Sequence, residues 1–253
     1  MIRPILAVLL AAFVLEPLAA ADKPFALRYY GLSYFQLETP SGKKIVFDPH
    51  AYADFGAPLV TADIITCSHR QRFKIAPEVV ENYKAARVFQ GLKEPNKRGA
   101  TEWNVIDEKV GTIKVRSLAT YHDAEDGRLR GKNAVFIVEA EGLTVCHLGN
   151  LGHELSAEQV KAIGPVDVLL VPVGGVYVLN GESAKKVADA IKPKRLIVPM
   201  HYGTPNFDEL LTPEEFLDGL KGVKKTPATN EIVLPATGAE TAPAIVMPGW
   251  KAK

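Results

Sequence analysis

The chain has 253 residues, of which 47% are hydrophobic, and a formal net charge of +1 at pH 7. This length and apolar fraction allow a sizeable core and suit one large α/β domain. Lysine and arginine residues are scattered along the chain, so the sequence predicts neither a nucleic-acid-binding stripe nor a polybasic membrane patch.

The first 21 residues have the pattern of a secretory signal peptide. Arg3 precedes an apolar run at positions 5–15, and small residues for cleavage follow at 19–21. We therefore expect residues 22–253 to form a single mature domain that is periplasmic or secreted. Because the apolar run is too short to span a bilayer, no membrane association is expected after the signal is removed.

The first part of the mature chain is rich in predicted strands. Aromatic and β-branched residues predict strands at 27–30, 34–38 and 44–47. Ser41-Gly42 supplies a hairpin turn between the last two strands. Asp48-Pro49-His50 ends the third strand, and we interpret His50 as a surface loop histidine rather than a ligand.

The next apolar run ends in polar residues and is a candidate site segment. Residues 63–66 have the β-branched, apolar character of a strand buried on both faces. Cys67 and His69 follow it two positions apart. In an extended backbone both side chains leave on the same side, so they could share one metal ion.

The rest of the chain alternates helical and strand patterns, which is typical of sheets covered by helices. Strands are predicted at 87–89, 112–118, 134–138, 143–146, 166–173 and 195–198. Helices are predicted at 76–86, 156–163 and 182–191, and from Thr212 onward. Ser156 with Gln159 has the spacing of a capping box. Thr212 is the expected cap of the last helix, with Pro213 in its first turn and Glu215 reaching back.

Residues 66–72 resemble the Thr-His-x-His-x-Asp-His signature of the metallo-β-lactamase superfamily, although His69 alone keeps a metal-ligand position. Four later segments occur in the order of that family: 120–123, 147–153, 167–175 and 198–204. The chain is similar to the lactonase-like branch from about residue 28 to about residue 220. This resemblance implies a four-layer αβ/βα sandwich of two mixed β-sheets with outer helices, and a site at one edge.

The same resemblance implies a depleted metal centre. When the ligand positions of the family are transferred to this sequence one by one, Cys67, His69 and His122 would hold the first ion. This set of ligands suits zinc. The second would meet Gln71, Arg72 and His201, with Asn150 at the bridge. Gln71 and Asn150 are neutral and Arg72 is positively charged, so a second dication is disfavoured. We therefore expect at most one zinc ion.

Most of these residues also have a structural interpretation. Cys67 can be a small buried hydrophobe, and a disulfide between Cys67 and Cys146 stays open. His69 and His122 can persist as hydrogen-bonded pocket residues, and His201 is interpreted as a pocket residue more than a ligand. The sequence predicts His147 to be packed at a strand end, His153 to lie at the rim, and Gly174-Gly175 to form a tight turn beside the site.

Two function classes remain. The first is an exported hydrolase that acts on an ester, lactone or phosphoester, with Asn150, His201 and Arg72 stabilising negative charge in the transition state. The second is a metal-free pseudoenzyme that binds a small molecule. The histidines favour the hydrolase, and the missing carboxylates favour the binding module. Both have a small-molecule partner and no nucleic acid, and the sequence leaves the oligomeric state open.

Overall fold

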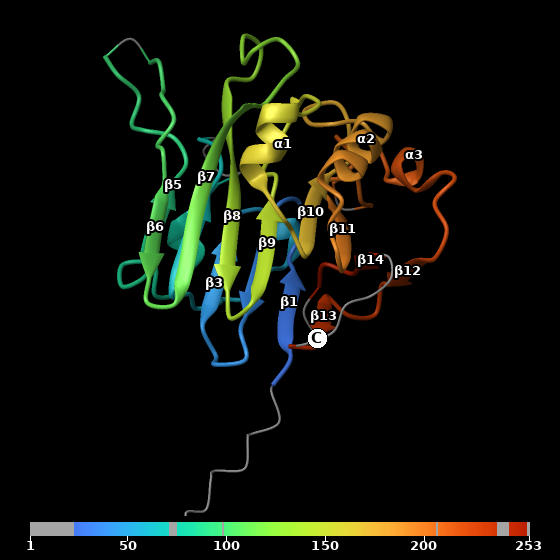
Figure 1. The fold of residues 1–253 in the computed structure, drawn as a ribbon, viewed down its shortest axis with the longest axis horizontal. Helices are drawn as coiled ribbons and strands as arrows, with labels where there is room; N and C mark the ends of the chain where they lie inside the picture. The colour runs from blue at the N-terminus through green and yellow to red at the C-terminus, as the bar shows by residue number, and fades with distance from the viewer. Residues whose placement is uncertain (1–22, 71–74, 98, 206, 237–242, 252–253) are drawn as a thin grey trace, which may run out of the picture.

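The computed structural model describes residues 23–70, 75–97, 99–205, 207–236 and 243–251. The predicted signal peptide at 1–21 lies outside these described residues, as do Gln71 and Arg72. Two β-sheets face each other, and Figure 1 shows β1 (Phe25–Tyr29) and β3 (Lys44–Phe47) behind β8 (Lys132–Ala140) and β9 (Leu143–His147). The predicted sandwich is thereby confirmed.

The first sheet has six strands in the order β13-β1-β2-β3-β4-β5. Its remaining strands are β2 (Phe35–Glu38), β4 (Ile64–Cys67), β5 (Arg87–Gln90) and β13 (Glu231–Leu234). The neighbours β3, β4 and β5 run parallel, whereas the other pairs are antiparallel. The strands predicted in this region are confirmed, and β13 brings a late segment of the chain beside the first strand.

The second sheet has eight strands in the order β12-β14-β11-β10-β9-β8-β7-β6. Its other strands are β6 (Asp107–Val110), β7 (Ile113–Tyr121), β10 (Val168–Pro172), β11 (Leu196–Met200), β12 (Val223–Thr226) and β14 (Ala244–Pro248). Pairing is antiparallel from β6 to β9 and parallel from β9 to β12. The sheet is therefore mixed, and its parallel part carries the helical connections.

The main hydrophobic core lies between the two sheets. It includes Phe35 and Phe47 from the first sheet and Phe136 from the second, all fully buried. Every residue of β10 is buried, as expected for a parallel strand covered on both faces. Burying a side chain of this size stabilises the fold by about 1.5–3 kcal/mol.

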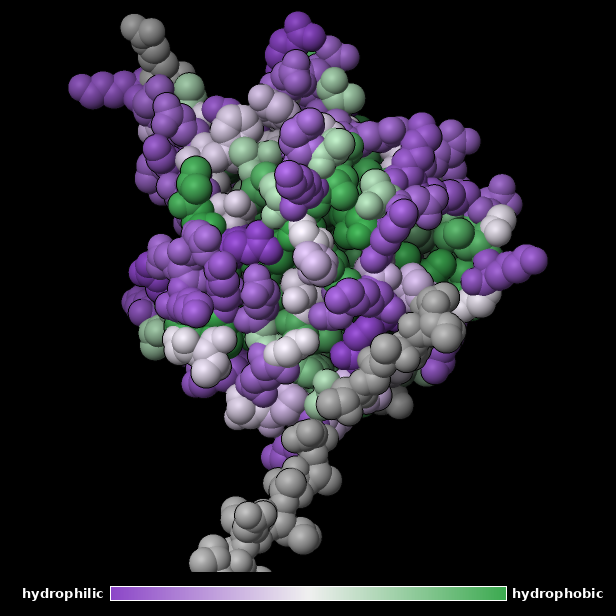
Figure 2. Space-filling model, in the orientation of Figure 1, coloured by the Kyte–Doolittle hydropathy of each residue, from purple (hydrophilic) through white to green (hydrophobic). Residues whose placement is uncertain are grey.

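The three α-helices of the described chain lie over the second sheet (Figure 1). They are α1 (Ala157–Ile163), α2 (Gly181–Ile191) and α3 (Glu214–Leu217). The predicted capping box of Ser156 and Gln159 is present at the start of α1. Ala184, Val187 and Ile191 of α2 are buried, while the outer face in Figure 2 is largely hydrophilic with apolar atoms visible between the charged side chains.

One predicted helix is absent, and another is present with a different cap. The segment predicted as a helix at 76–86 contains only a 3-10 turn, Pro77–Val79, which ends at Val80 with an extended backbone. The Asn82 side chain holds this segment to the main chain of Ala62, a long-range contact that periodicity does not reveal. Pro213, rather than Thr212, caps α3, and the Glu215 carboxylate accepts from the Gly181 amide instead of reaching back.

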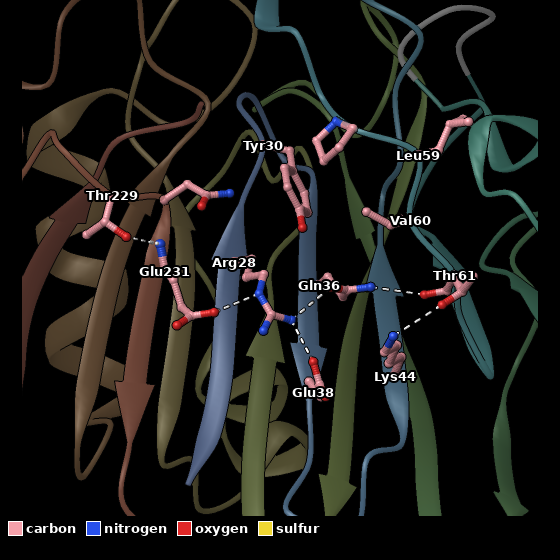
Figure 3. A pocket seen from close by; sticks show the side chains of 12 residues that line it. Arg28, Tyr30, Gln36, Glu38, Lys44, Leu59, Val60, Thr61, Thr229 and Glu231 are labelled. Atoms are coloured by element: carbon pink, nitrogen blue, oxygen red, sulfur yellow. Dashed lines mark hydrogen bonds and ion pairs between the residues drawn. The ribbon is translucent and has the colours of Figure 1, made fainter. Parts of the chain in front are cut away.

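The outer face of the first sheet is therefore covered by loops and 3-10 turns in the described chain. A separate apolar cluster, the outer cluster, lies there and includes Tyr30, Tyr34, Val46, Ile65, Cys67 and Val80. Beside it is a polar groove of about 620 Å³ (Figure 3). Arg28 crosses this groove and bonds Glu231 at 2.7 Å and Glu38 at 2.8 Å, which ties β13 to β1 and β2.

Within the described residues, no helix is long and apolar enough to cross a membrane.

Candidate functional site

The candidate site lies where strands of both sheets end. His69 comes two residues after β4, His122 directly after β7, Asn150 three residues after β9, and His201 directly after β11. All four side chains are buried. The loop that joins β7 to β8, next to His122, stands at the upper edge in Figure 1. The fold thus places residues that are spread over much of the sequence at the ends of strands from both sheets.

The centre of the site is a contact between His69, His122 and Asn150. The two imidazole rings are 5.2 Å apart, centroid to centroid, with 32° between their planes. The Asn150 side-chain nitrogen Nδ2 lies 3.3 Å from His69 Nε2. Three of the predicted site residues are therefore assembled.

A hydrogen-bond chain behind His69 orients its ring. Ser68 donates its hydroxyl to the Asp48 carboxylate and its backbone N–H to Asp48 Oδ1, the latter at 2.7 Å. Because the Ser68 proton is given to Asp48, His69 Nδ1, 2.8 Å from Ser68 Oγ, is assigned as the donor to that oxygen. His69 Nε2 then carries a lone pair, which faces the Asn150 amide.

Asp48 lies in an apolar surrounding. Burial raises the pKa of its carboxyl to about 7, although the two hydrogen bonds from Ser68 act in the opposite direction. His147 Nδ1 is 3.9 Å away, but burial lowers the pKa of His147 to about 4, so the imidazole is neutral at pH 7. His147 stacks on Phe47 at 5.3 Å and donates to the Ser33 carbonyl, which confirms the predicted packing role.

Asn150 is fixed from two sides. Ser33 donates its hydroxyl to Asn150 Oδ1 at 3.0 Å, and the Asn150 backbone N–H donates to Asn133 Oδ1 at 2.9 Å. Gly149 permits this approach, because a Cβ there would lie 2.5 Å from both Asn133 Oδ1 and Ser68 Cβ. The orientation that presents Asn150 Nδ2 to His69 is therefore set by surrounding groups.

His201 is held by main-chain contacts in a strained conformation. Its φ is +52°, a value that residues other than glycine seldom adopt. The His201 N–H donates to the Leu32 carbonyl at 2.9 Å, beside Ser33. A Cβ on Gly174 would lie 2.2 Å from the His201 carbonyl oxygen. The Gly174-Gly175 turn therefore lies beside the site as predicted, and the need for glycine there is close backbone packing.

The structure places Cys67 away from the predicted metal site. Cys67 packs in the outer cluster with Ile65, and burial raises the pKa of its thiol well above the usual value, which disfavours a thiolate ligand. Among the described residues, no three His, Cys, Asp or Glu side chains lie where they could hold one ion together. Ile65 and Cys67 both face the outer cluster, as alternate residues of β4 do, and the chain bends at His69 after the strand has ended. Cys67 and Cys146 are both free.

His50 is also misassigned by the sequence. It is buried, donates Nε2–H to the Tyr30 carbonyl at 3.2 Å, and has a pKa lowered to about 4 by burial. It is not a surface residue because the loop after β3 folds back over the outer face. His153 accepts the Tyr121 N–H at 3.1 Å, so it supports the residue that precedes His122.

Sequence reasoning missed Ser33, Asp48, Ser68 and Asn133 as parts of the site. Two signals were present: Asp48 ends a strand in an Asp-Pro pair, and Ser68 lies between two candidate ligands. Neither signal identifies the residue that it bonds, because hydrogen-bonded partners in this site lie far apart in the chain. Ser33 and Asn150, for example, are 117 positions apart.

A cleft of about 380 Å³ reaches His69 and is also lined by Arg70, Ile75, Pro77, Gln90, Glu94 and Pro95. The larger groove around Arg28 lies on the outer face of the first sheet, and its principal charges are already paired with one another. We therefore assign the functional site to the histidine-lined edge and a structural role to the charges of the larger groove.

Comparisons with known proteins agree with this placement. A model of the β-lactamase superfamily domain matches residues 26–201. A UPF0173 metal-dependent hydrolase of Pyrococcus furiosus is 34% identical over 166 residues, which cover 63% of this chain and 67% of that protein. Another, from Thermococcus onnurineus, is 26% identical over 192 residues, which cover 70% of this chain and 84% of that protein.

Solved structures show the same relationship. A Thermotoga maritima protein, predicted to be a Zn-dependent hydrolase of the metallo-β-lactamase superfamily, has a TM-score of 0.67 and 31% identity, covering 89% of this chain and 98% of its own. A predicted metal-dependent hydrolase of Parabacteroides distasonis has a TM-score of 0.56 at 18% identity, covering 79% and 89%. The second likeness concerns the fold alone.

These names imply a metal, yet the described residues of this chain do not fit a complete metal centre. Asn150 occupies the predicted bridging position and directs its amide at the His69 Nε2 lone pair. Cys67 lies in the outer cluster and would have to ionise in an apolar surrounding. His69 and His122 alone are two nitrogen donors, whereas zinc enzymes usually have three protein ligands.

Proposed function

The chain belongs to the metallo-β-lactamase superfamily, and on this basis we propose that it is a hydrolase of an ester, lactone or phosphoester. The observation that carries the proposal is the Asp48–Ser68–His69 chain, which leaves His69 Nε2 unprotonated beside Asn150. An imidazole held in one tautomer by a carboxylate-linked partner is suited to act as a general base.

In the proposed reaction, a water molecule first displaces the Asn150 amide from the His69 Nε2 lone pair. His69 Nε2 then accepts a proton from this water as the water oxygen attacks the carbonyl carbon or the phosphorus. Above about pH 7, where the Asp48 carboxyl is ionised, the imidazolium is stabilised through Ser68 by Asp48, and it returns the proton to the leaving alcohol oxygen. Asn150 Nδ2 and His201 are the groups proposed to donate hydrogen bonds to the developing oxyanion. Arg72 is proposed as a further stabilising charge, on the sequence pattern alone.

We further propose that the protein binds at most one zinc ion. The neutral amide of Asn150 replaces a carboxylate that would offset a dication, and Cys67 contributes no ligand in the described structure. The step derived above uses protein groups only, so it is independent of the amount of metal.

The test is a hydrolysis assay of protein purified without chelator, with its metal content measured by elemental analysis. An aryl ester, a γ-lactone and an aryl phosphodiester represent the three substrate classes. Loss of one general base typically lowers the rate by about 10²–10⁴-fold, so His69→Ala should lower kcat by this amount. His153→Ala is the histidine control, because the contacts of His153 are with the N–H and ring of Tyr121 and with the Glu154 carbonyl rather than with His69.

A metal-free binding module is the second candidate, and the absence of a three-ligand set among the described residues favours it. Under this alternative none of the three substrates is hydrolysed, but the protein still binds a product analogue. Replacement of His69 or His122 should abolish this binding. Hydrolysis that His69→Ala leaves intact would contradict both roles proposed for His69.

A further inference from the structure

Apolar side chains gather on three loops: the loop after His50, the turn after Gly175 and the loop after His201. We define the aromatic rim as Tyr52, Val176, Tyr177, Phe207 and Leu211. None of these side chains is fully buried, and Val176 and Leu211 are 48% and 54% exposed. An isolated exposed hydrophobic residue needs no explanation, but several gathered at one site indicate an apolar contact.

Direct contacts join one half of the rim to the site. The Arg130 guanidinium lies over the Tyr177 ring, 5.5 Å from its centroid, and the Arg130 carbonyl accepts from His122 Nδ1 at 3.4 Å. The turn that carries Tyr177 is anchored to the residue after Asn150, since the Leu179 N–H donates to the Leu151 carbonyl at 2.9 Å. Tyr177 is thus positioned relative to both His122 and Asn150.

The other half of the rim belongs to the loop that follows His201. Phe207 pairs with Thr204 in this loop, and Leu211 donates its N–H to the Gly174 carbonyl at 2.8 Å. Tyr52 packs edge-on against Phe207, with ring centroids 5.4 Å apart. Burial raises the pKa of Tyr52, with smaller contributions from neighbouring Glu209 and Tyr177. Tyr52, Tyr177 and Phe207 all pack against one buried apolar cluster of Leu32, Phe55 and Leu210, which joins the two halves of the rim.

The turn that exposes Val176 is strained. Val176 has a φ of +52°, which is an outlier for a β-branched residue. Such a conformation persists only where the surrounding structure imposes it, and it is concentrated at functional sites. A glycine or asparagine would fit the backbone better, yet the chain places an exposed apolar side chain there.

We propose that the aromatic rim binds a planar apolar group of the substrate, so that the substrate class is an ester or lactone with an aryl substituent. This inference rests on the proposed hydrolase function. Rigid Tyr and Phe rings bind such a group with little loss of side-chain entropy, and edge-to-face packing of the kind between Tyr52 and Phe207 is favourable for aromatic pairs. The reacting bond would then lie inward, toward His69 and Asn150.

The first test compares two esters with the same leaving group, trifluoroethyl 3-phenylpropanoate and trifluoroethyl propanoate. The phenyl group should raise kcat/KM by about tenfold, as expected when one aromatic ring is removed from water. Tyr177→Ala combined with Phe207→Ala should bring the ratio of the two kcat/KM values close to one. A wild-type ratio near one would overturn the proposal.

Replacing a valine inside the rim and a valine outside it gives a matched comparison. Val176→Ala should lower the ratio, whereas Val105→Ala, at an exposed valine that makes no contact with the rim loops, should leave it unchanged. Equal effects of the two replacements would also overturn the assignment, because the phenyl group would then not be bound at the rim.

The second test separates this inference from the hydrolase proposal. Binding of the free acids 3-phenylpropanoate and propanoate is measured by isothermal titration, without any reaction. If no ester is hydrolysed but 3-phenylpropanoate binds about tenfold tighter, and Tyr177→Ala removes the difference, the rim proposal stands while the hydrolase proposal fails. If both acids bind equally, the rim proposal fails whatever the enzyme activity.

Discussion

Asn150 donates its side-chain N–H to His69 Nε2 over 3.3 Å, at the position where relatives of this sequence pattern are expected to have a carboxylate. The amide orientation is fixed, because Asn150 Oδ1 accepts from Ser33. The contact satisfies the His69 lone pair within the protein itself. It therefore makes the metal content of the chain sensitive to a single change of charge at position 150.

Asn150→Asp should increase the uptake of zinc. A carboxylate at this position adds a negative charge and an oxygen ligand beside the lone pair of His69, and both favour a dication. Elemental analysis after dialysis should show more zinc per chain than in the wild type. Asn180→Asp makes the same charge change at the exposed N-cap of α2, where the side chain accepts from the Ser183 N–H. It should leave the zinc content unaltered. Unchanged uptake in Asn150→Asp would contradict this account of the site.

Cys67→Ala should leave the metal content unchanged, contrary to the expectation from the sequence motif. Cys67 packs with Ile65 and Val80 in the outer cluster, so its replacement removes apolar contacts and not a ligand. The expected loss in the free energy of unfolding is about 1 kcal/mol, measured by urea denaturation. Cys146→Ala is the matched buried cysteine control. A loss of zinc in Cys67→Ala alone would restore the ligand role.

Gly174→Ala should be strongly destabilising and should disturb His201. The added Cβ would lie 2.2 Å from the His201 carbonyl oxygen, and this oxygen belongs to main chain that cannot move freely. We expect a loss of about 3 kcal/mol or more, as for overpacking of a rigid contact. Gly111→Ala is the control: it has a φ of +60° but open space, so it should cost only about 1 kcal/mol. Similar losses of unfolding free energy in both variants would show that the close approach of Gly174 to the His201 carbonyl does not determine the cost.

The free energy of unfolding should rise between about pH 4 and 6.5. Burial lowers the pKa of His50 and His147 from 6.5 to about 4, so in this range the unfolded chain binds protons that the folded chain does not. Stability is then lost as the pH falls, by up to about 3 kcal/mol for each histidine. His147→Gln should flatten the profile measured by urea unfolding, and His153→Gln, at a half-buried histidine, is the control.

Asp48 should act in the opposite direction. Its pKa is raised from 3.8 to about 7, so the folded chain retains a proton that the unfolded chain loses, and stability falls as the pH rises through this range. Asp48→Asn removes this opposing contribution, and the rise between pH 4 and 6.5 should become steeper. A shallower rise in the variant would mean that Asp48 is ionised in the folded chain.

Export is a proposal that follows from residues 1–21 alone. If these residues are a signal peptide, the mature chain begins at Asp22 and is found in the periplasm or the medium. Mass spectrometry of protein expressed from the full sequence would decide the matter. Met1 retained on a cytoplasmic product would contradict it.

The sequence by itself determined most of the strands, the capped helix at 157–163 and the strand ends that carry His69, His122, Asn150 and His201, but it missed β6, β12, β13 and β14. These features depend on residues close together in the chain, because side-chain periodicity and capping act over a few positions. The family resemblance added the sandwich, which the structure confirms, and the convergence of the four positions, of which His69, His122 and Asn150 are in contact.

Only the tertiary structure decided which side chains face the site. Cys67 and His69 are two positions apart, yet Cys67 packs outward with Ile65 because β4 ends at Cys67 and the chain bends at His69, where Ser68 is bonded to Asp48, 20 positions away in the chain. The helix expected at 76–86 is replaced by a turn held to Ala62. The contact of Asn150 with Ser33 and the meeting of Tyr52 with Phe207 likewise join distant segments. Local patterns do not encode such contacts, because they form only when both sheets have packed together.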